Sequence, residues 1–147
     1  MQLSTRARYG FRAMMELAGH YGEGAVPLKE VAKCQDISLK YLEQLFARLR
    51  AAGLVKGVRG TGGGYILGRA PADITLAEVF RVLEGSTALV ECVDRPEVCS
   101  QSARCVTRDL WCELRDASDA ILEQRTLQDL LDARQVKDPV AATQYQI

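Results

Sequence analysis

The hydrophobic residues change their period at Gly53, and this change constrains the fold more than any other feature of the sequence. Before Gly53 they recur every three or four positions, which is typical of one face of a helix. After it they follow a two-residue period over 54–58, and a second short apolar segment follows over 65–67. This pattern is typical of two short strands. The sequence therefore predicts a helix followed at once by a β-hairpin. The helical period is carried by Leu39, Leu42, Leu45, Phe46 and Leu49.

A shorter helix, predicted over residues 28–34, precedes this one and begins after Pro27. A turn at 35–37 leads to Ser38, whose hydroxyl is placed to cap the next helix. Two helices joined by a short turn form a helix-turn-helix, which reads the major groove of DNA through its second helix. Side chains able to hydrogen-bond base edges and phosphates occupy the outer face of that helix: Lys40, Tyr41, Glu43, Gln44 and Arg48.

The glycine-rich segment 59–64 connects the two predicted strands, so the hairpin is expected to act as a wing. Arg59 stands near its tip, where a guanidinium can enter a narrow minor groove. The glycines let the backbone approach phosphates. A nucleotide-binding loop is excluded, because a strand follows the glycines where a P-loop or dinucleotide fingerprint needs a helix.

The rest of the chain predicts further helices and one irregular segment. We expect a helix over 4–21, a helix opened by a Thr75/Glu78 capping box and ended near Glu84, and an irregular stretch over 86–104. A long helix over 104–123 carries a wide apolar stripe, which favours packing on a partner subunit. A short helix begins at Thr126, and a loose tail follows Arg134.

These elements predict a mainly α-helical fold with one small β-hairpin. We divide it into a winged helix-turn-helix DNA-binding domain (1–84), a cysteine-containing sensor loop (85–104), a dimerisation helix with a short terminal helix (105–134), and a flexible tail (135–147).

The charged side chains are distributed unevenly between the two halves of the chain. The chain has 19 basic and 19 acidic side chains. Residues 1–70 hold 11 basic and 5 acidic side chains, however, and residues 71–147 hold 8 and 14. A basic half suits a polyanion such as DNA, whereas the acidic half indicates another role.

Five cysteines are present, and no apolar run approaches the roughly 18 residues that span a bilayer. The N-terminus lacks a secretion signal, so we expect a cytoplasmic protein with reduced thiols. Cys92, Cys99 and Cys105 are spaced too widely for a zinc module and contain no C-x-x-C motif. Soft thiolates in one loop favour an iron–sulfur cluster, although they can also be incidental loop thiols. We expect Cys34 in the core.

Several short motifs occur along the chain in this order: Arg8-Tyr9, Ile37-Ser38-Leu39, Tyr41-Leu42-Glu43-Gln44-Leu45-Phe46, Leu49-Arg50, Gly53-Leu54-Val55, Val58-Arg59-Gly60, Gly62-Gly63-Gly64-Tyr65, the cysteine loop and Leu110-Trp111. With these motifs the chain resembles, over about residues 1–133, the family of winged-helix iron–sulfur regulators that includes IscR and NsrR.

The resemblance implies a dimer that binds a palindromic operator in double-stranded DNA. It implies DNA contacts by Ser38, Tyr41, Glu43 and Gln44, with Lys40 adding a phosphate or guanine contact, and wing contacts by Arg59 and Gly60. It also implies a cluster, [2Fe–2S] rather than [4Fe–4S], on Cys92, Cys99 and Cys105.

The sequence departs from this family at the fourth cluster ligand. Arg108 occupies the position of a histidine in the best-known relative, and Arg8 the position of a carboxylate in others. A guanidinium stays protonated and cannot bind the metal. Cys112 is the obvious substitute, but along one helix it lies about 10.5 Å beyond Cys105. Both could bind one small cluster only if the helix starts after Cys105 or if the partner subunit supplies one of them. The fourth ligand is therefore open, and the other candidates are Asp109, Glu91, Asp94, Glu97 and His20.

We therefore expect a transcriptional regulator, a repressor in type, that is controlled by a cluster and senses iron–sulfur, redox or nitric oxide status. One alternative is a cluster-free regulator of cysteine or sulfur metabolism that responds to thiols or to a partner protein. Another is a redox or cluster-transfer protein without DNA binding. An enzyme is disfavoured, because the single histidine has no plausible catalytic partners.

Overall fold

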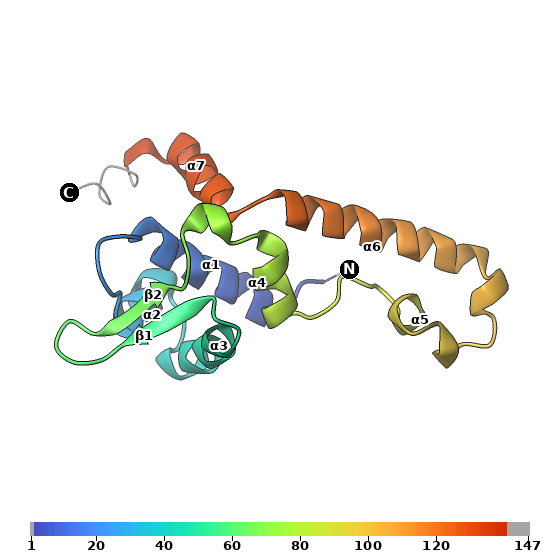
Figure 1. The fold of residues 1–147 in the computed structure, drawn as a ribbon, viewed down its shortest axis with the longest axis horizontal. Helices are drawn as coiled ribbons and strands as arrows, with labels where there is room; N and C mark the ends of the chain where they lie inside the picture. Colours follow the sequence, from blue (N-terminus) through green and yellow to red (C-terminus); the bar gives the residue numbers. More distant parts are fainter. Residues whose placement is uncertain (1, 141–147) are drawn as a thin grey trace.

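The chain forms a head and a long arm (Figure 1). The computed structural model describes residues 2–140. The first part of the head follows the predicted order: α1 (Thr5–Gly19), α2 (Leu28–Gln35), α3 (Leu39–Ala51), β1 (Val55–Val58), β2 (Gly64–Leu67), a 3-10 turn η1 (Pro71–Asp73) and α4 (Leu76–Leu83). The predicted fold class, mainly α-helical with one hairpin, is confirmed.

Polar side chains begin three of these helices, at Ser38 and Thr75 where the sequence predicts a cap and also at Ser4. The Ser4 hydroxyl accepts a hydrogen bond from the Ala7 N–H, and the Ser38 hydroxyl accepts one from the Tyr41 N–H. Thr75 and Glu78 form the expected reciprocal capping box at α4. Each cap satisfies an N–H group that has no partner within its helix, so the chain starts each helix at a defined residue.

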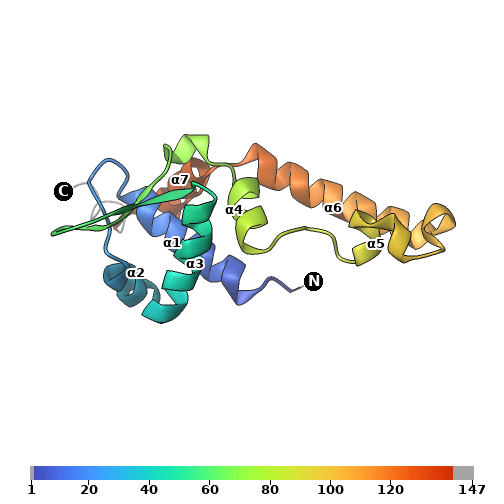
Figure 2. The same ribbon diagram turned by 60° about the horizontal axis from the view of Figure 1, so that its bottom comes forward.

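The hairpin is antiparallel and pairs Val55 with Leu67 and Val58 with Gly64. An isolated bridge joins Val26 to Tyr65, so the segment before α2 lies beside β2. The helix-turn-helix and the wing are thereby fixed to each other, and Figure 2 shows α2, α3 and the hairpin on one side of the head.

The arm consists of α5 (Glu91–Asp94), two 3-10 turns, η2 (Pro96–Val98) and η3 (Ser102–Arg104), and the long helix α6 (Val106–Gln124). The prediction of an irregular segment over 86–104 is therefore wrong in part, because residues 91–104 fold into short helical turns. α6 has no buried residue. No helix in the described part of the chain is long and apolar enough to cross a membrane.

The chain then returns to the head as α7 (Leu127–Lys137), which begins with a Thr126/Asp129 capping box. Leu127 is fully buried in the head core, and its N–H donates to the carbonyl of Ile74. Since α7 packs beside α1, it joins the end of the arm to the head. It also extends past Arg134, where the sequence predicts a tail; residues 141–147 of that tail lie outside the described residues.

Gly10 allows α1 to approach α4 closely. A Cβ built on Gly10 would lie 2.3 Å from Leu83 Cδ1, and Leu83 is only 1% exposed. We expect Gly10→Ala to lower the free energy of unfolding by about 1–3 kcal/mol, because the buried leucine has no space to move into. Urea denaturation measures this effect.

Gly57→Ala in β1 is the matched control, because its added Cβ meets nothing closer than 3.8 Å. It should be neutral or slightly stabilising. Equal midpoints for Gly10→Ala and the wild type would show that α1 and α4 can separate without cost.

Candidate functional site

The predicted DNA-reading residues lie on the outer side of α3. Ser38, Lys40, Glu43 and Gln44 are exposed, and Tyr41 is half-buried. Because α3 is held by its opposite face, where Leu42, Leu45, Phe46 and Leu49 are at most 1% exposed, these polar side chains project from a rigid support. The arrangement can present hydrogen-bonding groups to base edges in a major groove.

Two of these residues are close to the N-terminus of α1. The Tyr41 hydroxyl lies 3.3 Å from the Thr5 hydroxyl, and the Tyr41 ring packs edge-on against Tyr9. Gln44 lines the same depression as Tyr41, together with Arg6 and Arg48. This side of the recognition helix is therefore continuous with α1.

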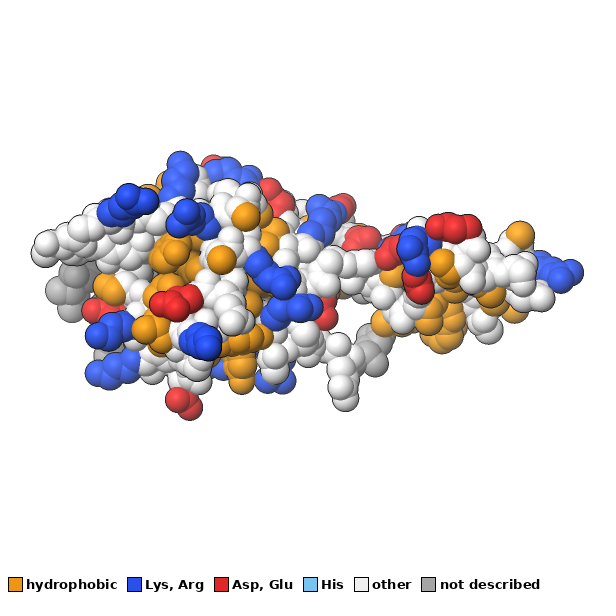
Figure 3. All heavy atoms as spheres, turned by 90° about the horizontal axis from the view of Figure 1, so that it is seen from below, with side chains coloured by type: hydrophobic (Ala, Val, Ile, Leu, Met, Phe, Trp, Pro, Cys, Tyr) orange, Lys and Arg blue, Asp and Glu red, His pale blue; other side chains and the backbone are white. Residues whose placement is uncertain are grey.

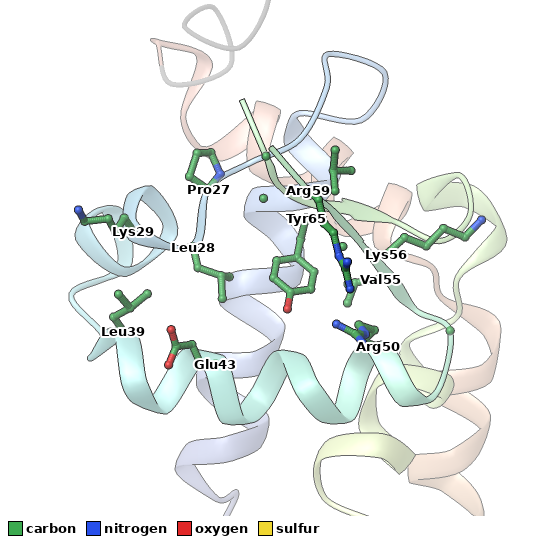
Figure 4. Close-up of a pocket in the computed structure, with 15 residues that line it drawn as sticks. Pro27, Leu28, Lys29, Leu39, Glu43, Arg50, Val55, Lys56, Arg59 and Tyr65 are labelled. Atoms are coloured by element: carbon green, nitrogen blue, oxygen red, sulfur yellow. The ribbon is translucent and has the colours of Figure 1, made fainter. Parts of the chain in front are cut away.

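Glu43 faces the other way, into a groove of about 810 Å³ between α3 and the wing. Figure 4 shows it at the end of the groove near Leu28 and Leu39. Arg59 lines the same groove from the wing side. Gly60 follows Arg59 with a φ of 95°, in the left-handed region that a glycine adopts without strain. The exposed residues of α3 therefore divide into two groups: Tyr41 and Gln44 lie on the side next to α1, and Glu43 lies on the side next to the wing.

Sequence reasoning missed three cations that line this groove: Lys29 from α2, Arg50 from α3 and Lys56 from β1. The sequence could have identified Arg50, because it follows Glu43 by seven residues and therefore lies on the same face of the helix. Basic side chains predominate over acidic ones on the face of the head shown in Figure 3. This face suits a polyanion.

The predicted cluster ligands lie at the far end of the arm. Cys92 is on α5, Cys99 follows η2, and Cys105 caps α6. All three are free thiols, Cys99 exposed and the other two half-buried. Within residues 2–140, however, no group of three or more His, Cys, Asp or Glu side chains is placed to hold a metal ion. The structure brings the three cysteines to one loop without bringing their sulfurs into a ligand group.

Arg108 fastens this loop to α6. Its Nε donates to the Cys92 carbonyl over 2.8 Å, and its Nη2 approaches the Val93 carbonyl at 3.5 Å. Nearby, the nearly buried Ser102 hydroxyl donates to the Pro96 carbonyl over 2.8 Å. The side chain at the position expected to supply a fourth ligand therefore holds backbone carbonyls instead.

The surroundings of Cys105 favour its thiolate form. A hydrogen bond with the Thr107 hydroxyl, 3.2 Å from the sulfur, and the backbone N–H of Arg108 hold the pKa of the Cys105 thiol below its ordinary value. Its place at the start of α6 is consistent with this shift, since helix N-termini stabilise anions.

Thiolate sulfurs are the ligands that iron–sulfur clusters use. The three thiols of the loop are free and not buried, so they are chemically suited to hold such a cluster.

The other two cysteines differ from these. Cys112 is half-buried within α6. Cys34 is exposed on α2, so the expectation that it belongs to the core is wrong. Its helix buries only Val31, so a position three residues further along the same helix is already exposed.

The fold and the exposed face of α3 define a winged helix-turn-helix transcriptional regulator. Sequence comparison gives the same class, since residues 3–133 match the family Rrf2, described as an iron-dependent transcriptional regulator. The chain belongs to the Rrf2 family.

Named relatives fall into two groups. The chain is 43% identical to the HTH-type transcriptional regulator IscR of Photorhabdus laumondii over 138 residues, which cover 94% of this chain and 84% of the relative. It is 45% identical to the HTH-type transcriptional regulator CymR of Bacillus subtilis over 130 residues, covering 88% and 89%. The solved structure of that CymR, titled the global cysteine regulator of B. subtilis, matches with a TM-score of 0.76 at 42% identity and covers 90% of this chain and 98% of its own. These relatives are regulators rather than enzymes.

Proposed function

We propose that this chain is a cytoplasmic homodimeric repressor that binds a palindromic operator and is controlled by a [2Fe–2S] cluster on Cys92, Cys99 and Cys105. The observation that carries the proposal is the position of three free, accessible thiols on one short segment between the DNA-binding head and α6. Iron, redox or nitric oxide status is the signal that such a site would report. The similarity to IscR over most of the chain supports the same reading.

DNA binding is assigned to the outer side of α3 and to the wing. Ser38, Lys40, Tyr41, Glu43 and Gln44 would contact bases and phosphates in the major groove, and Arg59 and Gly60 would contact the strand beside it. Glu43 accepts hydrogen bonds but repels phosphates, so it suits selection of a cytosine amine rather than general affinity.

The dimer is assigned to an apolar stripe on α6. Val106, Leu110, Leu114 and Ile121 are between 37% and 78% exposed, and their spacing places them along one side of the helix. Figure 3 shows hydrophobic side chains gathered on one side of the arm. Apolar surface of this extent on an arm that projects from the head suits a second copy of the same helix.

Regulation is assigned to the connections at the two ends of α6. Cys105 directly precedes the first turn of α6, and α7, which follows its last turn, packs against the head beside α1. A bound cluster would join three thiolates that the described loop holds apart, and so would give the arm two states. A shift of α6 then alters the spacing of two recognition helices, which must lie about one turn of DNA apart.

The test is anaerobic purification followed by measurement of iron, acid-labile sulfide and the electronic spectrum. Iron and sulfide in equal amounts, about two of each per chain, are expected. Their absence would favour the second candidate.

That second candidate is a cluster-free, thiol- or partner-responsive regulator of cysteine or sulfur metabolism. Two observations favour it: Arg108 binds the loop carbonyls, and the similarity to CymR is as strong as that to IscR. In that case Cys105, with its lowered thiol pKa, is the thiol we expect an oxidant or alkylating reagent to modify first.

Arg108→His tests whether position 108 lies beside the metal. A neutral imidazole is a good metal ligand, so this variant should lose iron in air several-fold more slowly than the wild type if the three cysteines hold a cluster. Arg108→Gln is the matched control, because it removes the same hydrogen bonds without offering an imidazole. Equal rates of iron loss in the two variants would place position 108 away from the metal.

A further inference from the structure

The groove between α3 and the wing contains two arginines that have no acidic partner. Arg50 comes from the last turn of α3, and Arg59 from the wing directly after β1. Both side chains are exposed, and neither guanidinium has a hydrogen-bond or ion-pair partner within residues 2–140. Like charges in one groove repel each other, so their convergence needs an anion to be favourable.

The two arginines meet beside Tyr65. In Figure 4 their guanidinium groups point into the same end of the groove, next to the Tyr65 side chain. A Cβ added at Gly57 would lie 4.0 Å from Arg50 Nη1 and 3.8 Å from Tyr65 Cε1, so Arg50 extends across the groove to β1. The Tyr65 ring is fixed by Phe46, whose centroid is 4.9 Å away. Two guanidiniums and one phenol hydroxyl therefore line one small region.

The path of DNA past the head supplies the anion. If α3 occupies the major groove and the wing reaches the adjacent minor groove, one sugar–phosphate strand separates the two grooves and must cross between these elements. That strand passes over the groove that Arg50 and Arg59 line. Guanidinium groups bind phosphate oxygens through paired N–H donors, which a lysine cannot reproduce.

We propose that Arg50, Arg59 and the Tyr65 hydroxyl form a clamp for one internucleotide phosphate of each operator half-site. The clamp rests on the DNA-binding role proposed above and refines it, because Arg59 then binds the strand rather than reading the minor groove. Glu43, the one acidic side chain among the groove residues, lies at the opposite end in Figure 4. The clamp sets position and affinity, and Glu43 and its neighbours on α3 set sequence preference.

The clamp is tested with a duplex selected by the wild-type protein from random sequences and with an unrelated duplex of equal length. Arg50→Gln and Arg59→Gln should each weaken binding about five- to tenfold at ~0.1 M salt, equally for both duplexes. Each should reduce the salt slope by up to about 1.8, because the contact is lost in both half-sites of the operator. Lys33→Gln removes an exposed positive charge of α2 outside the groove and should change neither quantity. Tyr65→Phe keeps the ring packing and should weaken binding about threefold without changing the slope.

A second measurement locates the phosphate. Single neutral methylphosphonates placed along the selected duplex should weaken wild-type binding at each contacted phosphate. At one position per half-site that effect should be reduced in Arg50→Gln, whereas the effects at the other positions should remain.

An unchanged salt slope in Arg50→Gln, or an altered sequence preference in Arg59→Gln, would overturn the clamp while DNA binding stands. Failure of the wild type to select any duplex would overturn both the clamp and the proposed function.

Discussion

Replacing Cys92, Cys99 and Cys105 together by alanine is expected to remove all iron and acid-labile sulfide from anaerobically purified protein. The three thiols are the only soft donors in residues 91–105 of the described chain, and the guanidinium of Arg108 cannot take their place. The visible absorbance of the protein should disappear with the metal. None of the three side chains is buried, so the helical content measured by circular dichroism should not change.

Cys34→Ala and Cys112→Ala are the matched controls, because each removes one thiol outside the loop. Cys34→Ala should keep full iron content, since Cys34 lies on α2 in the head. Cys112→Ala should keep it as well, because Cys112 lies two turns along α6 from Cys105. Iron retained in the triple variant would refute the ligand assignment, and iron lost in Cys112→Ala would make that thiol the fourth ligand.

The second large effect is expected from charges on the α6 stripe. Leu110→Glu combined with Leu114→Glu should convert the proposed dimer to a monomer, because the two carboxylates would face an apolar partner surface without compensating charges. Operator affinity should then fall at least about 100-fold, since two linked half-site contacts become independent ones. Sedimentation equilibrium measures the first result, and a binding titration measures the second.

Leu110→Met with Leu114→Met keeps the apolar surface and should preserve both the dimer and the affinity. A dimer that survives the two glutamates would place the subunit interface elsewhere.

The DNA-binding head is where sequence reasoning was most successful. The period change at Gly53, the cap at Ser38 and the Thr75/Glu78 box are local signals, and the structure has each of them where the sequence predicts it. Local signals work here because each element is short and its end is marked by a glycine or a capping side chain.

What the sequence did not predict depends on contacts between distant segments. The partnership of Arg50 with Arg59 needs the hairpin to fold back over α3. The return of α7 to the core needs Leu127 to pack near Ile74, more than 50 residues earlier in the chain. From the sequence Arg108 is only a residue that cannot bind a metal, whereas its hydrogen bonds to the Cys92 and Val93 carbonyls make it part of the loop structure. The sequence misplaces Cys34, because α2 is too short for its polar and apolar faces to be assigned from eight residues.

We propose that the presence or absence of a cluster on the cysteine loop sets the affinity of the protein for the operator. The most direct test measures the dissociation constant of one anaerobic preparation for its selected duplex, before and after the cluster is removed by a chelator and oxidant and the thiols are reduced again. We predict at least a tenfold difference between the two forms, and none in the Cys92/Cys99/Cys105 alanine variant. Equal affinities for the loaded and stripped wild-type protein, or a preparation without iron, would contradict control by a cluster.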